Sequence, residues 1–148
     1  MKNYLLPLSV LVFMLFHLNI QAQNKSNGDN MPGIRIISAV DIEEEVDGQP
    51  ASVSTVELII QPNQASAPHR HPGPVYGYVL EGIYEFKVEG HPLVTLKPGD
   101  TFYEPLMALH EVGKNPSETS KTKLLAIITH PRSSKQLVIP EKTIKSGE

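Results

Sequence analysis

Short runs of β-branched and aromatic residues, each closed by a turn signal, constrain the fold of this chain more than any other feature. The runs are IRIISAV (34–40), VSTVELIIQ (53–61), VYGYVL (75–80), IYEFKVE (83–89), LVTL (93–96), TFYE (101–104), KLLAIITH (123–130) and LVIP (137–140). Turn sequences rich in glycine and proline, such as VDGQP, EGHP and KPGD, separate them. No stretch sustains a helical period. This pattern predicts an all-β sandwich or barrel.

The first residues differ from this pattern and are typical of a secretory signal peptide, predicted over residues 1–22. Lys2 supplies a positive charge, residues 5–20 form an apolar stretch, and Ala22 places a small residue at the expected cleavage position. An uncleaved membrane anchor is the alternative, because the stretch approaches the roughly 17 residues that a spanning helix needs. A polar segment follows directly, so we expect cleavage and a periplasmic or secreted protein.

Cleavage would leave a polar linker, residues 23–33, followed by one folded domain, residues 34–148. It would remove one charged residue and leave 12 basic and 16 acidic residues, a formal net charge of −4. Such a surface attracts neither nucleic acid nor, after cleavage, a membrane. The chain has no cysteine, which excludes disulfides, thiolate zinc sites, iron–sulfur clusters and cysteine nucleophiles.

Three of the six histidines are candidate metal ligands. His69 and His71 are two residues apart, so on a strand both side chains point to one face. Two imidazoles inside a barrel are costly unless a shared divalent cation satisfies both. Two surface histidines are the alternative, and a bare His-x-His motif favours it. His17 lies in the predicted signal peptide, His91 follows a glycine in a predicted turn and His130 is interpreted as structural, which leaves His110 as the third candidate.

Two separated motifs favour the metal site over two surface histidines. HRHPGPVYGYVLEG (69–82) and KPGDTFYEPLMALHEVGKN (97–115) together resemble the two motifs of the cupin superfamily, in the same order. The resemblance implies a small single-domain cupin β-barrel, also described as a double-stranded β-helix or jelly roll. It also implies a divalent transition metal, held in the mouth of the barrel by His69, His71 and His110.

One position departs from the resemblance. Seven residues before Gly82, where most metal-binding cupins have a glutamate, this chain has Val75. Three interpretations remain open: a site of three histidines alone, a different carboxylate that replaces the missing one, or loss of the metal. Without the carboxylate, a bound ion keeps more of its charge and acts as a stronger Lewis acid. Gly77, two residues further along the strand, would then leave room beside the metal.

Glu104 is the predicted replacement for the missing carboxylate. In TFYEP, Phe102 and Glu104 share one face of a strand, and Thr101 and Tyr103 share the other. A buried glutamate in a small barrel needs a cationic partner, so Glu104 is expected to bind the metal or to act as a proton acceptor beside it. The alternative is a solvent-facing Glu104 at a sheet edge.

The resemblance implies a metal-dependent enzyme for a small-molecule substrate, of dioxygenase, isomerase or decarboxylase type. The alternative is a non-catalytic cupin module that binds a metal or a small ligand. The ion is expected to be Fe, Mn, Zn, Ni or Cu, since imidazole ligands suit Fe, Zn, Ni and Cu and a carboxylate suits Mn. We also expect a homodimer, because a small barrel with long apolar edge strands has to cover them, and residues 34–40 are candidates for the interface.

Overall fold

The structure is a computed structural model and describes residues 33–141. The predicted signal peptide, residues 23–32 of the predicted linker and residues 142–148 of the predicted domain lie outside this range. Within residues 33–141, no helix has the length and apolar character needed to cross a membrane.

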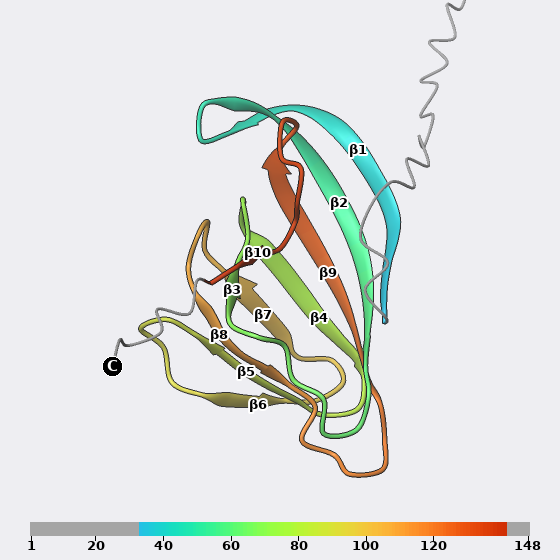
Figure 1. The fold of residues 1–148 in the computed structure, drawn as a ribbon. Helices are drawn as coiled ribbons and strands as arrows, with labels where there is room; N and C mark the ends of the chain where they lie inside the picture. Colours follow the sequence, from blue (N-terminus) through green and yellow to red (C-terminus); the bar gives the residue numbers. More distant parts are fainter. Residues whose placement is uncertain (1–32, 142–148) are drawn as a thin grey trace, which may run out of the picture.

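Residues 33–141 form ten strands in two sheets that face each other (Figure 1). The strands are β1 (Ile34–Val46), β2 (Gln49–Ile60), β3 (His69–Arg70), β4 (Val75–Glu81), β5 (Tyr84–Val88), β6 (Val94–Leu96), β7 (Thr101–Glu104), β8 (His110–Lys114), β9 (Thr122–Pro131) and β10 (Ile139–Pro140). One sheet has the order β1-β2-β9-β4-β7 and the other β10-β3-β8-β5-β6, with antiparallel neighbours throughout. The predicted all-β barrel is confirmed.

Two strands of the second sheet were not predicted from the sequence pattern. β3 has only two residues, and β8 begins with His110 and contains Gly113, so neither presents a β-branched run. Each forms because a neighbour supplies the ladder: His69 pairs with His110, and β8 pairs along β5. β1 is also longer than expected, since it continues through the exposed residues Glu43–Glu45 to the turn at Asp47 and Gly48.

The core lies between the sheets and follows the alternation of β4. Val75, Gly77 and Val79 point inward and are buried, whereas Tyr76 and Tyr78 point outward and are exposed. The main hydrophobic cluster joins β4, β7 and β9 of one sheet to β5 of the other; it consists of Val79, Tyr84, Phe86, Val88, Phe102 and Leu124. Burial of these side chains stabilises the closed barrel by about 1.5–3 kcal/mol for each large residue.

The expectation that Gly77 leaves room beside the metal is wrong. Gly77 pairs with Phe102 across β4 and β7, and a Cβ added at Gly77 would lie 1.9 Å from Phe102 Cζ. The aromatic ring therefore fills the space over the glycine. Gly77 marks a close approach, as glycine in a strand often does, but the approaching group is part of the core.

Candidate metal centre

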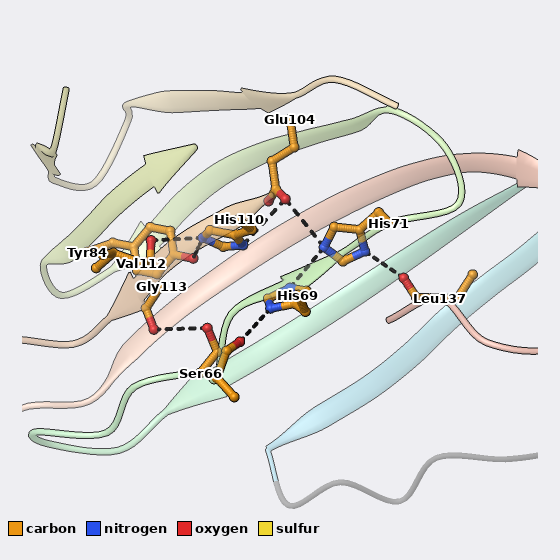
Figure 2. Close-up of polar contacts among 10 residues, drawn as sticks. Ser66, His69, His71, Tyr84, Glu104, His110, Val112, Gly113 and Leu137 are labelled. Carbon is orange, nitrogen blue, oxygen red and sulfur yellow. Dashed lines mark hydrogen bonds and ion pairs between the residues drawn. The ribbon is translucent and has the colours of Figure 1, made fainter. Parts of the chain in front are cut away.

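Four of the predicted site residues come together between the two sheets (Figure 2). His69 on β3 lies opposite His110 on β8, and His71 follows β3 by one residue. Glu104 ends β7 and approaches from the opposite sheet. All four side chains are buried. The three histidines, called the histidine cluster below, therefore face inward as predicted.

A backbone carbonyl holds one ring nitrogen of each member of the histidine cluster. The pairs are His69 Nδ1 with Ala67 O at 2.9 Å, His71 Nδ1 with Leu137 O at 2.6 Å, and His110 Nε2 with Val112 O at 2.9 Å. A carbonyl oxygen only accepts hydrogen bonds, so the nitrogen that faces it carries the hydrogen. In a neutral imidazole the other nitrogen is then an acceptor, which is the state of a metal ligand with a fixed tautomer.

The free nitrogens of the cluster converge with one carboxylate oxygen. His69 Nε2 and His71 Nε2 are 3.1 Å apart. Glu104 Oε2 lies 3.4 Å from His71 Nε2 and 3.4 Å from His110 Nδ1. Each histidine offers a nitrogen within 4.8 Å of those of the other two. Ligand atoms about 2.0 Å from a tetrahedral ion are roughly 3.3 Å apart, so the separations of 3.1 and 3.4 Å fit a shared ion.

Burial determines the charge state of the site. Burial, assisted by the neighbouring rings, lowers the pKa of His71 to about 4 and that of His110 to about 3, and burial also lowers the pKa of His69. Burial raises the pKa of Glu104 to about 8. At neutral pH and without a metal, the three rings are therefore neutral and Glu104 is mostly protonated.

The single proton on Glu104 does not satisfy all the acceptor atoms of the site. Among the described residues, Glu104 Oε2 and His110 Nδ1 are the buried side-chain atoms without a hydrogen-bond partner. A protonated Glu104 can donate to His71 or to His110 but not to both, and the nitrogens of His69 and His71 still face each other as acceptors. A divalent cation would satisfy all four atoms, since imidazole and carboxylate suit Zn, Fe, Mn, Ni and Cu. The three buried histidines could bind a metal, and the residues present fit one.

The register of β4 and β7 explains how the missing carboxylate can be compensated. Val75, the position at which the resemblance expects a glutamate, pairs directly with Glu104. Directly opposite residues of antiparallel strands have Cβ atoms about 4.5–5.5 Å apart and share a face. The predicted burial of Phe102 and Glu104, with Tyr103 exposed, is confirmed. The role of Glu104 as ligand or proton acceptor stays a prediction.

The segment between Glu104 and His110 is held in place by hydrogen bonds to Arg70 and His71. Met107 has a φ of 58°, an uncommon value for a residue other than glycine. Its N–H donates to the carbonyl of His71 at 3.1 Å, and its carbonyl accepts from Arg70 Nη1 at 2.8 Å. These bonds fix a conformation that costs about 1–3 kcal/mol, which is typical of segments that position a site.

Tyr84 and Gly113 complete the surroundings of His110, and no pattern in the sequence distinguished them from other tyrosines and glycines of the strands. The Tyr84 hydroxyl lies 3.4 Å from His110 Nε2, and burial raises the tyrosine pKa. A Cβ on Gly113 would lie 2.8 Å from this hydroxyl and 3.0 Å from His110 Cε1. The other tyrosines of the expected barrel strands, Tyr76, Tyr78 and Tyr103, are exposed on the outer face.

The remaining histidines of the described residues lie apart from the cluster. His91 is exposed in the turn after β5, as predicted. His130 is buried at the end of β9, where its Nε2 lies 2.9 Å from Ser54 Oγ and its Nδ1 lies 2.9 Å from the carbonyl oxygen of Pro131. These partners satisfy both ring nitrogens, which supports the structural interpretation of His130.

Comparisons with known proteins agree with the fold. Residues 56–128 match the sequence model of a family described as Cupin domain, and no curated protein sequence matches the chain. The DMSP lyase DddQ from Ruegeria pomeroyi DSS-3 is similar with a TM-score of 0.53 and 21% identity, over 87% of this chain and 61% of the lyase. An uncharacterised conserved protein with a double-stranded β-helix domain from Klebsiella pneumoniae subsp. pneumoniae MGH 78578 is similar with a TM-score of 0.52 and 17% identity, over 78% of this chain and 90% of that one.

An RmlC-like cupin from Shewanella frigidimarina NCIMB 400 gives a TM-score of 0.50 and 18% identity, over 76% of this chain and 97% of that one. The chain therefore spans nearly the full length of this small cupin, but less than two thirds of the length of the lyase. At these identities the similarity shows the fold alone.

Proposed function

Because the chain belongs to the cupin superfamily, we propose that it is a metal-dependent enzyme for a small oxygenated molecule. We propose that one divalent transition metal ion binds between His69 Nε2, His71 Nε2 and His110 Nδ1, with Glu104 Oε2 beside it. One observation carries this proposal. Four buried acceptor atoms face one another, and no donor among the described residues satisfies them together.

A bound ion would supply a Lewis acid that polarises an oxygen atom of the substrate. Glu104 would contribute the proton chemistry. Its Oε2 faces two of the proposed ligands, so a carboxylate at this position lies beside the ion and can accept a proton from a bound substrate. Among the reaction types implied by the family, this position favours isomerisation or decarboxylation, in which a proton has to move. Dioxygenation requires in addition a redox-active ion.

A non-catalytic module is the second candidate, and the same geometry supports it. If Glu104 binds the ion together with the histidine cluster, the protein supplies four ligands. Structural zinc sites are closed by four protein ligands, whereas catalytic zinc sites keep a position for water or substrate. The identity of the fourth ligand therefore separates the two candidates.

Metal binding by wild-type protein and by Glu104→Gln tests the proposal. The metal-free proteins are loaded separately with Zn²⁺, Co²⁺, Mn²⁺, Fe²⁺, Ni²⁺ and Cu²⁺, and the bound metal and its affinity are measured. If Glu104 is a base, the Gln variant keeps the metal and loses turnover of β-diketone, hydroxy-acid and keto-acid substrates. If it is a structural ligand, affinity falls by more than the roughly 10–100-fold that loss of an outer-shell partner costs, and the wild type shows no turnover. A wild type without stoichiometric metal would refute both candidates.

We also propose that the chain is exported and cleaved after Ala22. The charged start, the apolar stretch and the small residue at the cleavage position support this proposal. N-terminal sequencing of periplasmic or secreted protein should begin near Gln23. A membrane fraction with an intact Met1 would contradict it.

A further inference from the structure

The segment after β9 returns across the molecule to the histidine cluster. In Figure 1 the chain leaves the end of β9, turns, and runs back to β10 beside β3, the strand that carries His69. Residues 132–141, called the strap below, thus connect the central strand of one sheet to the ligand-bearing strand of the other. The strap has no assigned role in the proposed chemistry.

Both ends of the strap are anchored. At its start, Arg132 donates to the carbonyl of Ala51 at 2.9 Å and to that of Ile42. At its end, β10 pairs with β3, the Glu141 N–H donates to Pro68 O at 3.1 Å, and Glu141 Oε2 accepts from Arg70 Nε at 2.9 Å. Between the anchors, Lys135 is exposed. The strap is therefore a closed loop of surface chain with a trypsin site near its middle.

Leu137 connects the strap to the proposed ligands in two ways. Its carbonyl accepts the hydrogen bond from His71 Nδ1 at 2.6 Å, as Figure 2 shows. Its side chain packs on a buried cluster of the opposite sheet, formed by Val56, Val75, Ala126 and Ile128. Val75 is the direct cross-strand neighbour of Glu104. The side chain of Leu137 thus covers the inner surface next to Glu104, and its carbonyl orients His71.

We propose that Leu137 is a positioning residue for His71, and that the strap has to lift for a metal ion or a small ligand to reach the histidine cluster. When the strap is docked, the Leu137 carbonyl fixes the tautomer of His71 with Nε2 free, the state that a metal requires. When the strap lifts, His71 loses this partner and the inner surface beside Glu104 becomes accessible. Metal binding and strap docking therefore favour each other, as linkage requires. The metal-dependent half of this inference rests on the proposed function, whereas the anchoring by His71 does not.

Limited trypsin digestion of metal-free protein tests the anchoring. Cleavage at Lys135 reports on the strap, and cleavage at Lys87 and Lys114, on β5 and β8, reports on opening of the barrel. In His71→Ala, cleavage at Lys135 relative to the barrel sites should be about fivefold faster than in wild type, the size expected for one lost hydrogen bond. The matched control is His110→Ala, which removes a proposed ligand that bonds within its own strand. Equal relative rates in the two variants would overturn the inference, whether or not the protein binds metal.

Co²⁺ exchange tests the access route. Leu137→Ala keeps the carbonyl and removes the side chain that packs on the opposite sheet, so Co²⁺ uptake and its removal by EDTA should both accelerate, by about threefold or more. Leu93→Ala is the matched control, because Leu93 is 53% exposed and lies in the turn before β6. Unchanged exchange rates in Leu137→Ala would show that metal enters by another path. Absence of Co²⁺ binding by wild type would refute the proposed function, and the digestion of metal-free protein would still decide the anchoring.

Discussion

Replacement of Glu104 by Gln should change how the stability of the metal-free protein depends on pH. The folded carboxyl has a pKa of about 8, compared with an ordinary value of 4.5. A group whose pKa is raised on folding stabilises the folded state fully below its unfolded pKa, and loses this contribution as pH rises through its folded pKa. The amide of the Glu104→Gln variant is neutral at every pH. Relative to the variant, the wild type should therefore lose stability between pH 6.5 and pH 9.

The magnitude follows from the two pKa values. Linkage with values of about 8 and 4.5 gives a loss of about 2 kcal/mol between pH 6.5 and pH 9. Glu104 is 3% exposed, so screening by solvent leaves this effect largely intact. The histidine cluster is present in both proteins, so its contribution to the pH dependence cancels in the comparison. Its pKa values are lowered, so its contribution is lost as pH falls below about 6.5. The stability of metal-free wild type should therefore be greatest near pH 6.5.

Urea denaturation in EDTA measures this difference. The chain has no tryptophan and five tyrosines, so far-UV circular dichroism or tyrosine fluorescence is the appropriate signal. With a slope of about 1–3 kcal/mol/M, the wild-type midpoint should fall by roughly 1 M between pH 6.5 and pH 9 relative to the variant. Glu57→Gln is the matched control, because Lys123 and Arg35 lower the pKa of Glu57, out of this window. Parallel profiles for wild type and Glu104→Gln would refute the assignment of a buried, neutral Glu104.

Further predictions concern the metal, the core and the assembly. Alanine at any member of the histidine cluster should abolish stoichiometric Zn²⁺ binding, and with it the stabilisation by Zn²⁺ of about 2.7 kcal/mol at a concentration of 100 times Kd. The His91→Ala control should retain both. Full Zn²⁺ occupancy in all three cluster variants would contradict the site. If Glu104 is a ligand, Zn²⁺ affinity should rise about tenfold per pH unit from pH 6 to 8 and level off above, because Glu104 then has to release its proton; a flat profile would exclude it as a ligand. Gly77→Ala should lower the free energy of unfolding by about 1–3 kcal/mol, because its Cβ would meet the Phe102 ring, and an unchanged urea midpoint would contradict this packing. Light scattering at micromolar concentration should give the mass of a dimer, since β1 is a long edge strand with Ile36 and Ile37 exposed, and a monomer mass would contradict it.

Local patterns predicted those parts of the fold and site that depend on neighbours in sequence. Alternation in TFYE was enough to place Phe102 and Glu104 inward, and the spacing of His69 and His71 placed both on one face. That His110 joins them was implied only by the resemblance of the two motifs to those of cupins. The inferences from alternation succeeded because a strand has a period of two, whatever its partners are.

Long-range pairing determined what the sequence did not reveal. The register that sets Val75 opposite Glu104 joins two strands, and no local signal specifies it. The carbonyl partners of the cluster are backbone atoms, and Leu137 reaches His71 across 66 positions of the chain. Backbone groups carry no residue-specific signature, so their roles appear only with the fold. Gly77 was misinterpreted for the same reason, because the ring that fills its space belongs to another strand.

Anomalous diffraction from crystals loaded with Zn²⁺ would test the proposed metal centre most directly. We expect a single peak between the sheets, about 2.0–2.1 Å from His69 Nε2, His71 Nε2 and His110 Nδ1. Data collected above and below the absorption edge of the ion identify it without reference to any activity. A peak bound by other residues, or no peak at this position in fully loaded crystals, would contradict the site and the function proposed from it.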